Sequence, residues 1–246
     1  MSKETSVKKT VGIIGGMGPM ATVDLFRKIV AMTDADTDAG HIRLLIDNRP
    51  EIPDRTAAIL NGEDTPVAYI LDSATRLADM GADFLVIPCN TSHCFFEKIA
   101  KGAPIPVINM IEETAIQLQK NGVSTVGLLA TDGVLRVGVY DRILAEHGIR
   151  VLHPSEARQR EVMYMIYDEI KAGNPTHPES LEPLLADMML IGAQAFILGC
   201  TELPLAFDSY TVGRERFYDP TAILAAAAIK RAGYKLREGR DTHTIY

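Results

Sequence analysis

Two of the three cysteines in this chain occupy matching positions in a repeated sequence pattern. Cys89 follows the apolar run 84–87, and Cys200 follows the apolar run 195–198, each after a helical stretch and a glycine-alanine turn. The polar residues directly after each cysteine favour a helix start, whose free N–H groups lower a thiol pKa and bind carboxylates. A single buried cysteine is usually a small hydrophobic residue, but this pairing predicts that both cysteines take part in chemistry.

Two thiols on related loops suit the inversion of a stereocentre. One group removes a proton from one face of a carbon, and the other group returns a proton to the opposite face. A symmetric pair works in both directions, because the thiolate and the thiol exchange roles. General acid–base catalysis requires that Cys89 and Cys200 both reach the same carbon and that one of them is deprotonated.

Other kinds of site are open from the residues alone. Cys89 and His93 have the i, i+4 spacing of metal ligands, but two ligands are too few and the chain has no CxxC motif. Cys89 and Cys200 could instead form a redox pair. The glycine-rich stretch 12–18 lacks the order G-x-G-x-x-G and a following lysine, so we expect a close-approach turn rather than a phosphate loop. Cys94 has no counterpart in the second half and is expected to serve in packing.

The elements that would position these cysteines form two similar series of strands and helices. The stretch 10–14 (TVGII) is echoed by the stretch 125–129 (TVGLL), and each begins one series. Apolar strands alternating with helices predict parallel sheets covered by helices, with functional loops at the carboxyl ends of the strands. The fold class is therefore α/β, with two pseudosymmetric lobes and a site in the cleft between them. We assign residues 1–109 and 214–246 to lobe 1 and residues 110–213 to lobe 2.

Particular elements are expected from the apolar periodicity. A loop at 47–56 contains prolines that rule out a continuous helix. The expected strands are 10–15, 42–46, 84–87, 105–108, 123–130, 150–152 and 195–198. The expected helices are 21–32, 67–80, a helix after Thr91, one that ends near 119, then 135–147, 156–172, 179–190 and one that ends at 231.

Composition excludes several classes of protein. The chain has 246 residues, 47% hydrophobic and 23% charged, which is ordinary for a globular protein. A net charge of −7 argues against a nucleic-acid-binding surface, which needs a basic face. Residues 1–9 lack the apolar region of a signal peptide, and no apolar stretch is long enough to span a membrane. Three cysteines without disulfide spacing fit a reducing compartment, so a cytoplasmic location is expected.

Several motifs taken together resemble the aspartate/glutamate racemase family of cofactor-independent amino-acid racemases, and most closely its aspartate racemase branch. These motifs run in order through nearly the whole chain. They are Gly15-Gly16-Met17-Gly18-Pro19, Ile52-Pro53-Asp54-Arg55-Thr56, Cys89-Asn90-Thr91-Ser92-His93, Ile170-Lys171-Ala172-Gly173 and Gly199-Cys200-Thr201-Glu202-Leu203. Glutamate racemases carry an Asp-Ser pair in the first loop and a Cys-Thr-His second motif, which this chain lacks.

The resemblance implies a function and a set of site residues. It makes Cys89 and Cys200 the acid/base pair of a pyridoxal-phosphate-independent racemase that interconverts L- and D-aspartate, without metal or nucleotide. It also implies a homodimer. The implied substrate-binding residues are Met17, Arg55, Asn90, Thr91, Thr131, Lys171, Thr201 and Glu202.

Alternatives stay open at this point. The substrate range could extend to glutamate or a broader set of amino acids. The superfamily also contains arylmalonate-type decarboxylases and maleate or hydantoin isomerases. A non-catalytic thiol-redox or amino-acid-binding protein is the alternative from another class.

Overall fold

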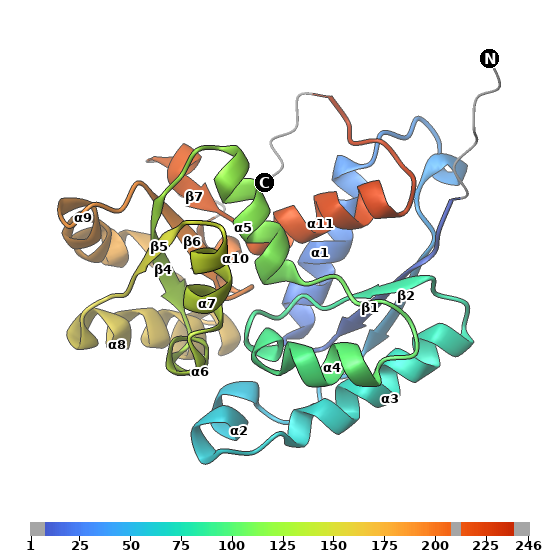
Figure 1. Cartoon of the computed structure of the whole chain (residues 1–246), viewed down its shortest axis with the longest axis horizontal. Coiled ribbons are helices and arrows are strands. Elements are labelled where there is room, and N and C mark those ends of the chain that lie inside the picture. The colour runs from blue at the N-terminus through green and yellow to red at the C-terminus, as the bar shows by residue number, and fades with distance from the viewer. Residues whose placement is uncertain (1–7, 208–212, 239–246) are drawn as a thin grey trace.

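The chain forms two parallel β-sheets, each lying between layers of helices (Figure 1). The computed structural model describes residues 8–207 and 213–238. In the first sheet the strand order is β2-β1-β3, and in the second it is β5-β4-β6-β7. The strands are β1 (Val11–Gly15), β2 (Leu44–Asn48), β3 (Phe84–Val86), β4 (Thr125–Ala130), β5 (Arg150–Leu152), β6 (Ala195–Gly199) and β7 (Phe217–Tyr218).

The two sheets repeat one topology. β1 pairs in parallel with β2 and β3, as β4 pairs in parallel with β5 and β6. β1, β3 and β6 are buried along their whole length, as expected for parallel strands covered on both faces. The α/β class and the pseudosymmetric arrangement predicted from the sequence are therefore confirmed.

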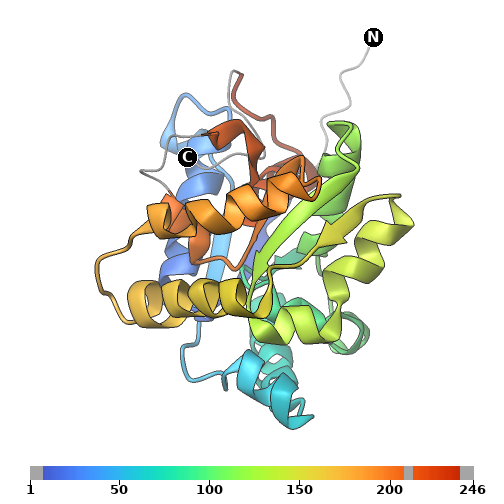
Figure 2. The same cartoon turned by 90° about the vertical axis from the view of Figure 1, so that its left-hand side faces the viewer.

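Helices cover both faces of each sheet. The α-helices are α1 (Pro19–Met32), α2 (Arg55–Asn61), α3 (Thr65–Asp79), α4 (Phe96–Gly102), α5 (Met110–Lys120), α6 (Asp132–Val137), α7 (Val139–Glu146), α8 (Glu156–Tyr164), α9 (Glu182–Leu190), α10 (Leu203–Phe207) and α11 (Pro220–Arg231). Short 3₁₀ helices lie at Asp38–Gly40, Thr91–Phe95, Pro178–Leu181 and Arg214–Arg216, and a π-helix spans Met165–Lys171. Figure 2 shows α8 and α9 along one face of the second sheet.

Two helices each pack against a different sheet from the one whose strands precede them in the chain. α5 follows the first sheet, yet Ile111, Ala115 and Leu118 are buried with the core of β4 and α7. α11 follows β7 of the second sheet, yet Leu224 and Ile229 are buried with β1 and α1. α5 and α11 also contact each other at the centre of the molecule (Figure 1). The two lobes are thus joined by an exchange of helices.

Strand pairing differs from the expected lobe boundary at residue 214. Phe217 and Tyr218 were expected in lobe 1, but they pair with Phe196 and Ile197 of β6 in the second sheet. The chain crosses to lobe 1 only at α11, because the apolar side of that helix fits β1 and α1. The lobe ranges otherwise remain a prediction, and residues 1–7, 208–212 and 239–246 lie outside the described part of the chain.

Three sequence expectations differ from the structure in detail. The stretch 105–108 makes one bridge, Leu85 to Val107, instead of a strand, because Pro104 and Pro106 lack backbone N–H groups. The helix expected at 135–147 is divided into α6 and α7 by Gly138, whose φ is 65°. The helix expected at 156–172 changes from α to π geometry at residue 165.

A buried ion cluster joins α1 to the start of α11. Lys28 is paired with Asp24 one turn earlier on α1 and lies 2.7 Å from Asp219, and all three side chains are at most 2% exposed. Asp219 is also the N-cap of α11, where it accepts the N–H of Thr221. Burial alone would lower the pKa of Lys28, but the two carboxylates outweigh this effect and raise it. The cluster fixes where the exchanged helix α11 begins.

Within residues 8–207 and 213–238, none of the helices combines the length and apolar character needed to cross a membrane.

Candidate functional site

A cavity of about 580 Å³ lies between the two lobes. Lobe 1 contributes the glycine turn after β1 and the loop that leads into α2, and lobe 2 contributes the end of the π-helix and the loop after β6. Arg55, Lys171 and Glu202 are the charged lining residues that the sequence predicted as substrate-binding. Neither Cys89 nor Cys200 is part of the lining, and both side chains are buried, at 4% and 6% exposure.

Cys89 lies in the loop that follows β3 of the first sheet. The ring of His93 holds this loop through hydrogen bonds to two backbone groups. The ring Nδ1 of His93 donates to the carbonyl of Cys89 (2.9 Å), and its Nε2 accepts the N–H of Met110 (3.1 Å). Burial lowers the pKa of His93 to about 4, so the ring is neutral with its proton on Nδ1. His93 is 2% exposed, so it does not lie on a helix surface. It fixes the backbone of the cysteine and leaves both ring nitrogens occupied.

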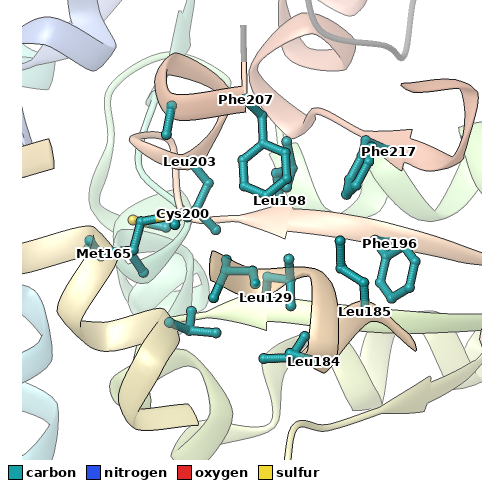
Figure 3. Packing of buried hydrophobic residues seen from close by; sticks show 14 of the residues in the cluster. Leu129, Met165, Leu184, Leu185, Phe196, Leu198, Cys200, Leu203, Phe207 and Phe217 are labelled. Atoms are coloured by element: carbon teal, nitrogen blue, oxygen red, sulfur yellow. The ribbon is translucent and has the colours of Figure 1, made fainter. Parts of the chain in front are cut away.

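Cys200 lies at the equivalent point of the second sheet and is bonded to a carboxylate. Its Sγ donates to Oε2 of Glu202 (3.0 Å), which also accepts the hydroxyl of Thr201 (3.2 Å). The other oxygen of Glu202 accepts the N–H of Gly18 from lobe 1 (3.2 Å). Figure 3 shows Cys200 at the edge of a hydrophobic cluster that includes Met165. Glu202 is therefore a bridge between the lobes as well as a partner of the thiol.

This environment keeps Cys200 protonated. Burial raises the pKa of the Cys200 thiol well above its usual value, and the negative charge of Glu202 raises it further. Lys171 acts in the opposite direction but does not outweigh these effects. If the two cysteines work as an acid and a base, Cys200 is the acid in the resting protein.

Arg55 is the first residue of α2, a helix that the prolines at 50 and 53 concealed in the sequence. Those prolines lie outside α2, which begins after its N-cap Asp54, whose side chain accepts the N–H of Ala57. Nη1 of Arg55 donates to the carbonyls of Ile52 (3.2 Å) and Pro53 (3.1 Å). Its buried Nε has no partner among the described residues, so it remains available to a ligand.

Neighbouring groups keep the guanidinium group of Arg55 positively charged. Burial works against the guanidinium cation, but interaction with Cys89 and Asp54 outweighs it and raises the pKa of Arg55. The cation thus lies beside Cys89, whereas a carboxylate lies beside Cys200.

Lys171 reaches the cavity from the end of the π-helix. A π-turn inside a longer helix is often found at functional sites, because the extra residue changes where side chains point. Nζ of Lys171 lies 4.2 Å from the ring centroid of Tyr167, and the Tyr167 hydroxyl donates to Asp54 of lobe 1 (3.4 Å). Desolvation would lower the pKa of Lys171, but Glu202 and Cys200 outweigh it and raise the pKa.

The remaining predicted residues lie around the Cys89 loop. Thr131, the N-cap of α6, has its hydroxyl 3.2 Å from that of Thr91 across the lobe boundary. The Met17 sulfur accepts the Ser92 hydroxyl (3.3 Å). Asn90 is 1% exposed and accepts a hydrogen bond from Tyr140. Contacts thus connect most of the predicted residues in one region, whereas their roles toward a substrate stay predictions.

The geometry also bears on the other kinds of site. Both nitrogens of His93 are bonded to the backbone, so a Cys89–His93 metal pair lacks its imidazole ligand. No cluster of three or more metal-ligating side chains occurs in the described ranges. In the glycine turn, Gly16 has φ of 92°, and a Cβ there would lie 2.3 Å from the Arg49 backbone. This is the close-approach turn that the sequence predicted.

Three residues near the site were missed by sequence reasoning. Tyr140 contacts the predicted residue Asn90 from the other lobe, Tyr167 lies against Lys171 and bonds to Asp54, and Asp54 caps a helix that was not predicted. Asp54 could have been predicted, because aspartate is a preferred helix N-cap residue. Its side chain accepts the free backbone N–H of the residue three positions later, here Ala57. Nothing local in the sequence connects Tyr140 with Asn90, fifty residues apart.

Comparison with known proteins gives consistent matches over most of the chain. The model of the family described as Asp/Glu/Hydantoin racemase matches residues 14–228. The structure of an aspartate racemase from Picrophilus torridus superposes with a TM-score of 0.79 at 34% identity, covering 94% of this chain and 96% of that one. An aspartate racemase homologue from Pyrococcus horikoshii OT3 superposes with a TM-score of 0.74 at 25% identity, covering 92% and 99%. The broad specificity amino-acid racemase RacX of Bacillus subtilis is 26% identical over 226 residues, which are 89% of this chain and 96% of RacX.

Proposed function

The chain belongs to the Asp/Glu/hydantoin racemase family, which makes it an amino-acid racemase and therefore an isomerase, and we propose that it interconverts L- and D-aspartate without pyridoxal phosphate. One observation carries the proposal. Two cysteines occupy equivalent loops of two pseudosymmetric sheets, and each lies beside a charged residue that lines the cavity, Arg55 for Cys89 and Glu202 for Cys200. Cys89 and Cys200 are the acid/base pair.

The proton transfers follow from the different surroundings of the two thiols. The Cys89 thiolate takes the α-proton of one enantiomer and becomes a thiol, and the C–H electron pair stays on the α-carbon. The neutral Cys200 thiol gives its proton to the opposite face of that carbon and becomes a thiolate. The opposite enantiomer reacts by the reverse sequence. Support comes from the raised pKa of Cys200, which keeps this thiol protonated in the resting protein.

The α-proton of an amino acid is a weak acid, so the negative charge formed at the α-carbon needs stabilisation. Donors already in position around the substrate carboxylates supply it, and burial strengthens their effect. In our proposal Asn90, Thr91 and Thr201 hold the α-carboxylate. Arg55 and Lys171 hold the side-chain carboxylate, which favours an acidic amino acid, since arginine recognises carboxylates by paired hydrogen bonds. Met17, Thr131 and Glu202 complete the pocket.

The test is proton NMR of L-aspartate with the purified protein in D₂O, with reductant and no added cofactor. We expect loss of the α-proton signal together with formation of D-aspartate. A parallel series with L-glutamate and neutral amino acids measures the substrate range. Faster exchange on glutamate or on a neutral amino acid would refute the aspartate proposal and leave the racemase family intact.

Single cysteine variants test the two-base mechanism. Cys89→Ala and Cys200→Ala are each expected to lower racemisation by about 10²–10⁴-fold, because a general acid or base is lost. Cys94→Ala is the matched control. Cys94 is partly buried, burial raises its pKa to about 12, and it packs against the core of lobe 2. Near-wild-type racemisation in either of the first two variants would rule out the pair.

We also propose a homodimer, as expected from the resemblance. Supporting it are exposed apolar side chains on neighbouring parts of lobe 1, namely Met20, Val23 and Phe26 of α1 and Ile46 of β2. Sedimentation velocity gives the oligomeric state directly.

A further inference from the structure

The side chain of Asn90 is buried with only one of its two polar ends bonded. Its Oδ1 accepts the hydroxyl of Tyr140 at 2.6 Å. Its Nδ2 is buried and has no hydrogen-bond partner among the described residues. Leaving a buried donor unpaired is unfavourable, and folded proteins rarely do so. An unpaired NH₂ group next to a catalytic cysteine is therefore a donor in position for a ligand.

Tyr140 reaches Asn90 from the other lobe. It lies on α7 and is fully buried among core residues of lobe 2, whereas Asn90 lies in the loop of lobe 1 that carries Cys89. Burial raises the pKa of Tyr140, so the phenol keeps its proton and donates it. Asn90 directly follows Cys89 in the chain, so the bond lies beside that cysteine.

We propose that Tyr140 is a positioning residue that orients the Asn90 amide so that both N–H groups face the α-carboxylate of the substrate. An asparagine amide has two orientations that fit the same space. With the oxygen turned toward the substrate, it would repel the carboxylate. Here the Tyr140 hydroxyl donates to Oδ1, so the oxygen is turned toward Tyr140 and the unpaired NH₂ group is left as the double donor. The inference depends on the proposed function, because it requires a substrate carboxylate at Asn90.

The chain contains a matched control for a tyrosine–asparagine bond. The hydroxyl of Tyr218 accepts Nδ2 of Asn121 at 2.8 Å, and Tyr218 is also buried, at 3% exposure. Asn121 is the C-cap of α5 and is not one of the residues assigned to the substrate. Tyr218→Phe thus removes a comparable buried bond without touching the residues assigned to the substrate.

The experiment measures KM and kcat for L-aspartate by α-proton exchange in Tyr140→Phe, Tyr218→Phe, Asn90→Ala and the Tyr140→Phe/Asn90→Ala double variant. We expect Tyr140→Phe to raise KM about 5–10-fold with a smaller change in kcat, as for one lost hydrogen bond that orients a donor. Asn90→Ala raises KM further. In the Asn90→Ala background, Tyr140→Phe adds no further rise, because the two residues act as one unit. Tyr218→Phe leaves KM unchanged.

A second variant tests the donors even if Tyr140→Phe does not fold. Asn90→Asp keeps an acceptor for the Tyr140 hydroxyl but replaces both N–H groups with a negative oxygen. We expect it to fold and to lose aspartate binding in isothermal titration calorimetry.

The outcomes separate the two proposals. A KM for Tyr140→Phe within twofold of wild type, an equal rise in the Asn90→Ala background, or wild-type aspartate affinity in Asn90→Asp would overturn the role of Tyr140. A wild-type protein that exchanges no α-proton of any amino acid would overturn the proposed function and this inference with it.

Discussion

The two halves of the molecule share a β-sheet topology and differ in where they place charge. The Cys89 loop is held by neutral partners, the ring of His93 and the hydroxyls of Tyr140 and Thr131. The Cys200 loop contains a buried carboxylate, Glu202, bonded to the thiol itself. Repetition of the backbone brings two thiols to equivalent positions, and the different side chains around them give these thiols different electrostatic surroundings.

The exchanged helices show the same contrast. α11 begins at Asp219, which is paired with buried Lys28, whereas α5 begins at Asn109, whose neutral side chain accepts the N–H of Ile111. Both caps do the same geometric task, but only one needs a cation in the core. The symmetry of the fold therefore does not imply that equivalent parts contribute equally to the free energy of unfolding. The contribution of each charged group can be tested by replacing it.

The largest effect is expected from the buried cation of lobe 1. Lys28→Met leaves the buried carboxylate of Asp219 without a cation and leaves Asp24 with only the half-exposed Arg27, so it should lower the free energy of unfolding by about 3–5 kcal/mol. Arg27→Met is the matched control. Arg27 binds the same Asp24 at 2.8 Å but is 50% exposed, so a loss of at most about 1 kcal/mol is expected. Urea unfolding measures both, and equal losses would show that Lys28 has no special role.

The next effect concerns the neutral ring under Cys89. The pKa of His93 is about 4 in the folded protein and 6.5 without the fold, so the unfolded chain takes up the proton first as pH falls. The stability that the neutral ring contributes is complete above pH 6.5 and is lost between pH 6.5 and about 4.

Unfolding of wild type and His93→Gln across this pH range measures that loss. The difference between the two proteins should change by up to about 3 kcal/mol, since one pKa unit corresponds to about 1.4 kcal/mol. Parallel curves would mean that His93 is not held neutral by its two backbone bonds.

The smallest effect concerns the carboxylate beside Cys200. Glu202→Gln removes one of the causes that raise the pKa of Cys200, so the pH at which Cys200 becomes alkylated should fall. Burial, the larger cause, remains, so Cys200 should still react only at a high pH. Iodoacetamide labelling with peptide-resolved mass spectrometry reports each cysteine separately.

Thr201→Val provides the control without a change of charge, because Thr201 also donates to Glu202. A shift as large in Thr201→Val as in Glu202→Gln would contradict an electrostatic origin.

Sequence patterns predicted the repeated architecture because buried parallel strands must be apolar along their length. The apolar runs that contain Ile13, Val86 and Ile197 could be recognised as buried strands for this reason, and Cys89 and Cys200 follow the second and third of these runs. The parallel, helix-covered character of both sheets and the positions of Cys89 and Cys200 after their strands could thus be predicted, whereas the strand order could not.

Contacts between lobes could not be predicted from the sequence. The pairs Tyr140–Asn90 and Gly18–Glu202 depend on how two sheets face each other, and no local pattern encodes that geometry. The helix that carries Arg55 was missed for a local reason. Pro50 and Pro53 indicated a loop, but both lie before the N-cap Asp54 and so do not interrupt the helix. The protonation state of Cys200 could not be predicted either, because it depends on the contact between the Cys200 thiol and the Glu202 carboxylate, although both residues belong to one of the motifs quoted from the sequence.

The exchange of helices has a consequence for synthesis. Lobe 1 emerges from the ribosome first, but one face of its sheet is covered by α11, which ends at Arg231. Until that helix is synthesised, Val11, Ile13 and Val86 lack the α11 side chains that complete their hydrophobic cluster. Lobe 2 already has α5 when β6 appears, because α5 precedes it in the chain. The part of the protein that is translated first is therefore the part that is completed last.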